Sequence, residues 1–250
     1  MDESPPVNRN VFAVLFALAI LLLVFATTFL LVHGATRLGV IPVDFLAYGF
    51  VFPFIVQLVA LGIAIYAGLY LGKSIGVGAP LLESWAKGEP VKDRAVSALK
   101  ISLAIGLGVT AMKYLLDLLV FSPFLPATIS QLRGVPVEFL FSIPFQQGIG
   151  DEIIYRLFWM TVIVWVIWKI RGSENAPRAW MYWMGILLAG LILVAGLIIS
   201  GTRGLVVLQY AVLILAGAIP FGWLYWKRGI ESALVAHFVS SVALTLLALA

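Results

Sequence analysis

The sequence predicts an all-α polytopic membrane protein, in which about seven transmembrane helices form one bundle and residues 1–250 make a single membrane-embedded domain. Two observations lead to this fold class. Of the residues, 62% are apolar and only 11% are charged, whereas soluble domains are about 45–50% apolar and about 25% charged. The apolar residues are also grouped into segments of about 20 residues or more, the length that a helix needs to cross the roughly 30 Å hydrocarbon core of a bilayer.

The expected spans follow one another along the chain. The first has no basic cluster before it, because Asp2 and Glu3 precede Arg9, so we interpret it as a retained membrane anchor rather than a cleaved signal peptide. The long loop from Lys73 to Ala95 either contains a short interfacial helix or is a solvated connector. The predicted spans are Val11–Val32, Phe45–Leu71, Val96–Phe121, Val137–Trp168, Trp180–Ser200, Leu205–Trp226 and Ile230–Leu249.

Basic residues are distributed unequally between the two sides of these spans. Ten Lys or Arg residues fall on the side of the N-terminus and of the second, fourth and sixth loops, and three fall on the opposite side. Cytoplasmic loops carry the excess of Lys and Arg, which predicts an integral protein of the cell membrane with a cytoplasmic N-terminus and an external C-terminus. Tryptophans that flank the fourth and sixth loops agree, because aromatic residues gather at membrane interfaces.

The rare residue types exclude several kinds of chemistry. The chain has no cysteine, so disulfides, thiolate metal sites and a cysteine nucleophile are excluded. Its two histidines, His33 and His237, are too few for a metal site built from several histidines. Membrane lipids are the expected partners, and no nucleic acid is expected, because the basic residues lie mainly in loops beside the membrane.

The fourth span contains a cluster of charges in the segment GIGDEIIYR, Gly148 to Arg156. Each charge at bilayer depth costs at least about 2.5–3.5 kcal/mol on insertion scales and therefore requires an explanation. Glu152 and Arg156 are four residues apart and share one helix face, while Asp151 projects about 100° away. An ion pair that lets the helix insert explains Glu152 and Arg156 but not Asp151. Two carboxylates beside one arginine leave a net negative site, a candidate general base or metal ligand.

Two other spans contain ionisable residues. Lys113 and Asp117 are also four residues apart, so we expect an internal ion pair; alternatively, Lys113 stabilises the carboxylates of the fourth span. His237 lies about 12 Å beyond the start of the last span at Gly229. A lone buried histidine is more often structural than catalytic, but this depth and the acidic pair elsewhere favour a functional role.

Acidic residues and a histidine within a helical bundle indicate either hydrolysis by an activated water or ion transport. The zinc-protease motif HExxH is absent. A serine mechanism would need Ser200 with His237 but has no third residue to orient the base. The GIGD segment matches the GxGD pattern of intramembrane aspartyl proteases, but that chemistry needs a second aspartate, and only Asp117 lies in another span.

Two segments in the last part of the chain, about 137–250, resemble motifs of the CPBP family of intramembrane proteases, which includes the CaaX-processing endopeptidases and the Abi proteins. DEIIYRLFW is similar to the EExxxR motif, and FGWLYWKRGIESALVAHFVSS is similar to the last motif. The resemblance implies an endopeptidase that cleaves membrane-tethered or lipidated peptides near the cytoplasmic leaflet. It implies Asp151 or Glu152 as the base, Arg156 holding the acidic pair, and His237 with Ser241 supporting the oxyanion.

The sequence departs from the family pattern at three positions. Asp151 replaces a glutamate, Thr202 falls where the middle motif has a histidine, and Ser241 replaces the final Asn or Asp. A divalent metal such as zinc would have Asp151, Glu152 and His237 as its ligands at most. We therefore expect a weak or divergent protease. The alternatives are a non-catalytic protein of the same fold that binds a membrane partner and a proton or ion pathway.

Overall fold

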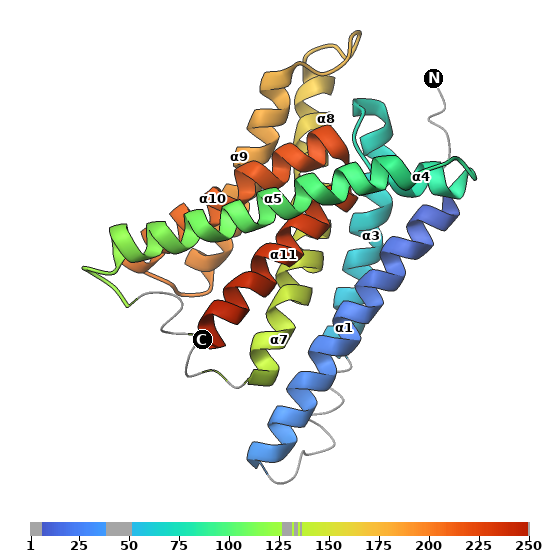
Figure 1. The fold of residues 1–250 in the computed structure, drawn as a ribbon. Coiled ribbons are helices and arrows are strands. Elements are labelled where there is room, and N and C mark those ends of the chain that lie inside the picture. Colours follow the sequence, from blue (N-terminus) through green and yellow to red (C-terminus); the bar gives the residue numbers. More distant parts are fainter. Residues whose placement is uncertain (1–6, 39–51, 127–131, 133–134, 136, 250) are drawn as a thin grey trace.

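The computed structural model describes residues 7–38, 52–126, 132, 135 and 137–249, and these residues form helices and loops with no strand among them (Figure 1). Six helical segments are long and apolar enough to cross a membrane. The prediction of an all-helical integral membrane protein is thereby confirmed. The six segments are Phe54–Ile75, Lys92–Phe121, Leu140–Ile170, Ala179–Ile199, Leu205–Arg228 and Ile230–Leu249.

The helices follow the order of the predicted spans. The first predicted span lies in a helix of 30 residues, whose apolar part among the residues searched, Arg9–Val24, is shorter than a membrane span. The second was expected to begin at Phe45, but residues 39–51 lie outside the described part of the chain. The elements are α1 (Arg9–Leu38), α3 (Phe52–Ile75), α4 (Pro80–Ala86), α5 (Lys92–Leu116), η2 (Asp117–Phe121), α7 (Val137–Phe145), η3 (Gln146–Met160), α8 (Thr161–Ile170), α9 (Ala179–Ile199), α10 (Leu205–Arg228) and α11 (Ile230–Leu249).

The loop between α3 and α5 contains α4, one of the two conformations that the sequence left open. Pro80 lies in its first turn, where the missing N–H of proline is not needed. The Leu82 N–H donates a hydrogen bond of 2.9 Å to the Glu231 carboxylate, at the start of α11. This bond satisfies a backbone donor that the helix itself cannot use, and it fixes α4 to the beginning of α11.

The most enclosed span is α11. Half of its residues are buried within the protein, compared with 22% to 33% in the other spans. It packs against α5, α7, η3 and α10, and Figure 1 shows it between α5 and α7. A side chain that projects from α11 is therefore held by several neighbouring helices.

Small residues line the contact between α5 and α11. The Ser102 hydroxyl donates to the Ser232 carbonyl at 2.9 Å, and the Thr110 hydroxyl contacts Ser240 Oγ at 3.1 Å. A Cβ atom on Gly106 would lie 2.5 Å from the Ala236 carbonyl oxygen. Lipid tails are as apolar as leucine, so membrane helices associate through such close contacts rather than through exclusion of water. The small-residue stripe consists of Ser102, Gly106 and Thr110 on α5 and Ser232, Ala236 and Ser240 on α11.

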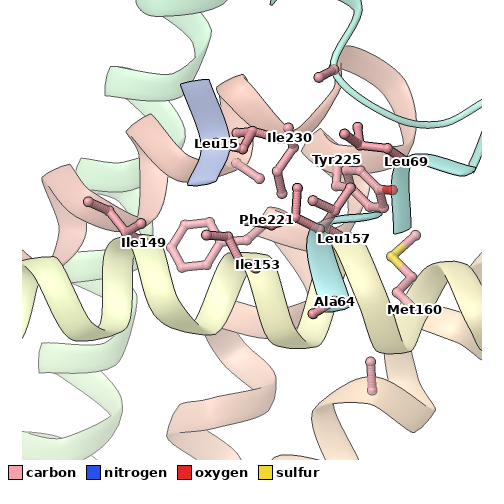
Figure 2. Close-up of a cluster of buried hydrophobic side chains, with 14 of the residues drawn as sticks. Leu15, Ala64, Leu69, Ile149, Ile153, Leu157, Met160, Phe221, Tyr225 and Ile230 are labelled. Carbon is pink, nitrogen blue, oxygen red and sulfur yellow. The ribbon is translucent and has the colours of Figure 1, made fainter. Parts of the chain in front are cut away.

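A cluster of buried apolar side chains joins η3 to α1, α3 and α10 (Figure 2). Ile153 and Leu157 of η3 have no exposed surface, and neither does Phe221 of α10. Contact between well-packed side chains is the main source of helix association in lipid. This cluster therefore holds η3, which contains the charged segment, against the other helices.

Candidate functional site

The charged segment of the fourth span lies in η3, a stretch of π-helix that runs between α7 and α8. Such wide turns are rare and occur frequently at functional sites. Arg156 Nε lies 3.5 Å from Glu152 Oε1, and their side chains have 5% and 0% of their surface exposed. The ion pair predicted from the four-residue spacing is therefore present and almost fully buried.

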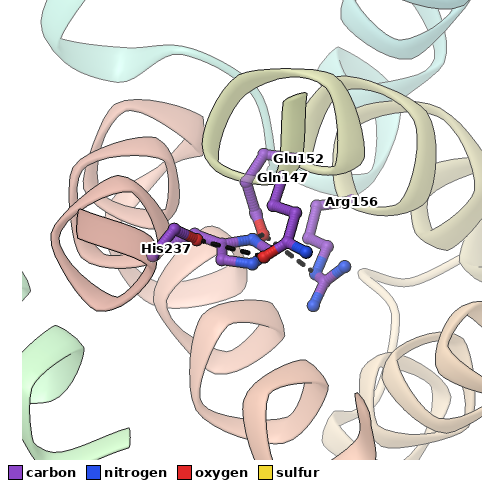
Figure 3. Close-up of polar contacts among 5 residues, drawn as sticks. Gln147, Glu152, Arg156 and His237 are labelled. Carbon is purple, nitrogen blue, oxygen red and sulfur yellow. Dashed lines mark hydrogen bonds and ion pairs between the residues drawn. The ribbon is translucent and has the colours of Figure 1, made fainter. Parts of the chain in front are cut away.

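His237 of α11 meets the same carboxylate. Its Nδ1 lies 2.8 Å from Glu152 Oε1, so a hydrogen bond joins two residues that are 85 positions apart (Figure 3). The imidazole stacks on the Phe221 ring of α10, with 4.6 Å between the ring centroids and 25° between the planes. Three elements thus converge on one histidine: Phe221 of α10 covers a face of the ring, and Glu152 of η3 binds its polar edge.

Gly148 allows η3 to approach α11 at this point. A Cβ atom on Gly148 would lie 2.7 Å from the Phe238 Cα, in the residue next to His237. Any larger residue would push the helices apart. Because Glu152 lies about one turn after Gly148, this close approach brings its carboxylate within hydrogen-bond distance of the histidine.

One oxygen of Glu152 has a distinct environment. Oε1 contacts both His237 and Arg156, whereas Oε2 is buried and has no hydrogen-bond partner among the described residues. Leaving a buried polar atom without a partner costs about 1–3 kcal/mol. The geometry therefore indicates that Oε2 is positioned to accept a hydrogen bond from a molecule such as water or a substrate.

A second polar contact lies one turn along α11 from His237. The Ser241 hydroxyl donates a hydrogen bond of 3.4 Å to Gln147 Oε1, at the beginning of η3. Figure 3 shows Gln147 beside Glu152. Ser241 was predicted from the sequence as a site residue, whereas Gln147 was not. The available signal was the polar pair Gln146–Gln147 in an apolar span.

Asp151 and Lys113 lie near this centre and interact with it electrostatically. Both are partly exposed, and Lys113 interacts electrostatically with Asp151, Glu152, Arg156 and His237. Its Nζ lies 3.0 Å from the position that a Cβ on Gly217 would take. These interactions support the alternative in which Lys113 stabilises the carboxylates of the fourth span. The two cations Lys113 and Arg156 balance the two carboxylates Asp151 and Glu152. The net negative charge that the sequence predicted for this site is therefore absent from the described residues.

Asp117, the expected partner of Lys113, is buried and accepts a hydrogen bond of 2.7 Å from the Gln209 amide of α10. The spacing of charges in α5 did not indicate this contact between two spans. Asp117 thus has a polar partner on a neighbouring helix in addition to any interaction with Lys113.

Thr202 lies in the loop between α9 and α10, where its N–H donates to the Leu197 carbonyl at 3.1 Å. The 24 residues of α10 extend about 36 Å from this loop to the beginning of α11. The structure thus places Thr202 at a helix end, whereas Glu152 and His237 lie within helices. Its expected part in the site stays a prediction.

The expected metal ligands do not form a complete coordination set. Among the described residues, no group of three or more His, Asp or Glu side chains is arranged to hold a metal ion. Glu152 and His237 use their facing atoms in a hydrogen bond with each other. A catalytic zinc ion needs three converging protein ligands, which these residues do not supply as placed.

No family model matches the chain, and neither a curated protein nor a solved structure matches it. The likeness to the CPBP family therefore depends on the two motif-like segments described above. What the structure adds is geometric: it brings Glu152 of the first segment and His237 of the second into direct contact. This contact is the basis for a functional proposal.

Proposed function

We propose that the chain is a membrane-embedded hydrolase of the CPBP type, an endopeptidase that cleaves membrane-tethered or lipidated peptides with a water activated by Glu152. The buried hydrogen bond between Glu152 and His237 is the observation that carries this proposal. General bases act within about 2.6–3.2 Å of the proton that they accept. The unpartnered Oε2 of Glu152 is the acceptor for that proton.

The residues support a stepwise hydrolysis. Glu152 Oε2 takes a proton from water, whose oxygen bonds to the carbonyl carbon of the peptide. The Gln147 amide N–H, oriented by the hydrogen bond that Gln147 Oε1 accepts from Ser241, stabilises the negative charge on the carbonyl oxygen. The peptide C–N bond then breaks, and the proton held by Glu152 passes to the leaving amine. Arg156 and His237 keep the carboxylate oriented throughout.

The proposal includes a membrane topology. We propose that α1 completes a set of seven spans, with the N-terminus in the cytoplasm and the C-terminus outside. His237 is the eighth residue of α11, about 11 Å from the start of that helix. The site then lies nearer to the cytoplasmic leaflet, where a lipidated chain end would be presented.

The decisive experiment measures cleavage of a membrane-tethered peptide by the full chain in vesicles, with products identified by mass spectrometry. Glu152→Gln removes the base with little change in shape, and we expect cleavage to fall by about 10²–10⁴-fold. The control is Glu174→Gln, which changes an exposed loop glutamate in the same way. Cleavage that survives both Glu152→Gln and Asp151→Asn would refute a carboxylate mechanism.

A proton or ion pathway is a second candidate, and one observation favours it. Electrostatic interactions inside the spans join five ionisable residues: Lys113, Asp151, Glu152, Arg156 and His237. Ionisable residues in membrane spans often mark ion routes. This candidate predicts proton or ion flux in vesicles that Asp151→Asn reduces, without peptide cleavage. A non-catalytic partner-binding protein would give neither cleavage nor flux.

A further inference from the structure

A second concave region lies away from Glu152 and His237, among the ends of α1, α3, α8 and α10. It is a cavity of about 1400 Å³, and α4 and the residues after it close one side. Six of its described lining residues are basic and one is acidic. The basic residues are Arg9, Lys73, Lys87, Lys169, Lys227 and Arg228, and the acidic residue is Glu83.

Membrane topology alone does not account for this arrangement. An excess of basic residues on one side of a membrane protein is expected, but it requires only that they lie in the loops. Lys92, Arg94 and Arg171 fall in the same set of loops predicted from the sequence and do not line the cavity. The six lining residues come from distant parts of the chain and converge on one open cavity.

Aromatic rings hold two of the cationic side chains at the cavity. The Lys227 ammonium lies 3.6 Å from the centre of the Trp226 ring, and the Lys169 ammonium lies 5.0 Å from that of Trp168. Stacking restrains these long side chains before any ligand arrives. Tryptophan also favours the level of the lipid headgroups, and both rings line the cavity.

We propose that this basic cavity binds a phosphate-bearing anion, with the headgroup of an anionic phospholipid as the source that its tryptophan lining favours. Basic pockets between membrane helices bind such headgroups. Sites for small ligands typically occupy about 300–1,000 Å³, so the volume accommodates a headgroup with more than one phosphate. The proposal does not depend on the hydrolase proposal, because the cavity contains none of Glu152, Arg156 and His237.

The test uses the full chain in nanodiscs of phosphatidylcholine. The first probe is a cardiolipin labelled on an acyl chain, and the second is inorganic pyrophosphate. The double variant Lys169→Gln/Arg228→Gln removes two charges from the cavity. The matched control, Lys92→Gln/Arg94→Gln, removes one lysine and one arginine from exposed positions in the first turn of α5. The sequence predicts these positions on the same side of the membrane as the cavity residues. The double variant Lys169→Arg/Arg228→Lys keeps the charge.

We expect the cavity variant to weaken cardiolipin binding about thirtyfold, because each Lys or Arg near the surface contributes roughly a factor of five. The control and the charge-keeping variant change it less than about threefold. Pyrophosphate that binds with the same dependence on Lys169 and Arg228 would identify a soluble phosphate compound as the source. Equal losses in the cavity and control variants, or no binding of either probe by the wild-type chain, would overturn the proposal. The charge-keeping variant separates loss of binding from failure to fold.

Discussion

Glu152 is buried between a permanent cation and an imidazole. Oε1 contacts Arg156 at 3.5 Å and His237 at 2.8 Å, and the glutamate has no exposed surface. Taking a carboxylate out of water is costly unless partners compensate it. The three residues therefore depend on one another, and a change in one leaves the others without compensation.

Removal of the carboxylate is expected to destabilise the protein. Glu152→Ala leaves the Arg156 charge buried without its partner, at a cost of about 3–5 kcal/mol in the free energy of unfolding. Glu152→Gln should cost less, because the amide still accepts a hydrogen bond. Unfolding titrations in mixed micelles measure both values. Equal stability of wild type and Glu152→Ala would contradict the mutual dependence.

Gly148 is expected to tolerate no side chain. Gly148→Ala places a Cβ 2.7 Å from the Phe238 Cα, and the resulting overpacking costs about 1–3 kcal/mol. It also moves Glu152 away from His237, so cleavage should fall together with stability. Gly196→Ala is the matched control, because a Cβ there has open space. The same unfolding titration and the cleavage assay compare the two variants.

Asp151→Glu is expected to increase cleavage. The longer side chain restores the acid that the resemblance implies at this position beside the base Glu152, and complete acid–base assistance contributes about 10²–10⁴-fold. Turnover of the membrane-tethered peptide measures the effect. A rate that does not change would assign Asp151 to the electrostatic surroundings of Lys113 rather than to the reaction.

At the scale of elements, α5 and α11 interact closely through their small-residue stripe. The stripe contains hydroxyl groups that bond to backbone or side-chain oxygens of the partner helix. Hydrogen bonds between membrane helices are worth about 0.6 kcal/mol on average, so close packing contributes most of the attraction. The stripe also sets the position of α11, which determines where His237 lies.

The two glycines of α5 provide a direct test of this packing. Gly106→Ala places a Cβ 2.5 Å from the Ala236 carbonyl, whereas Gly108→Ala meets nothing within 4 Å. We expect the first change to destabilise the protein by about 1–3 kcal/mol and the second to be neutral or stabilising by about 0.5–1 kcal/mol. Thermal unfolding of both variants in the same detergent makes the comparison. Similar losses in both would contradict a specific interface.

At the scale of the whole molecule, the spans were predictable and most of the contacts between them were not. Apolar length alone indicates where helices cross the bilayer, and the Glu152–Arg156 pair follows from helical spacing. The contact of Glu152 with His237 joins residues 85 positions apart, so no local pattern contains it. The π-helical conformation of η3, the role of Gly148 and the bond between Gln209 and Asp117 also depend on the packing of helices against one another.

The proposed topology predicts opposite locations for the two chain ends. Reporter fusions to the full chain should be active in the cytoplasm at the N-terminus and outside the membrane at the C-terminus, because the basic loops lie on the side of the N-terminus. As the control, each terminus is fused to a reporter that is active only in the opposite compartment, and this reporter should be inactive. Both ends on one side would mean that α1 does not complete a seventh span.

The stacking of His237 on Phe221 restricts which ring nitrogen can accept a proton. A half-turn of the ring would put Cδ2 in the place of Nδ1, and it would break both the bond to Glu152 and, on the way, the stacking on Phe221. When the carboxylate is ionised, it selects the tautomer that carries the proton on Nδ1. The imidazole then offers only the lone pair of Nε2 to its surroundings, so His237 in this tautomer can accept a further proton only at Nε2.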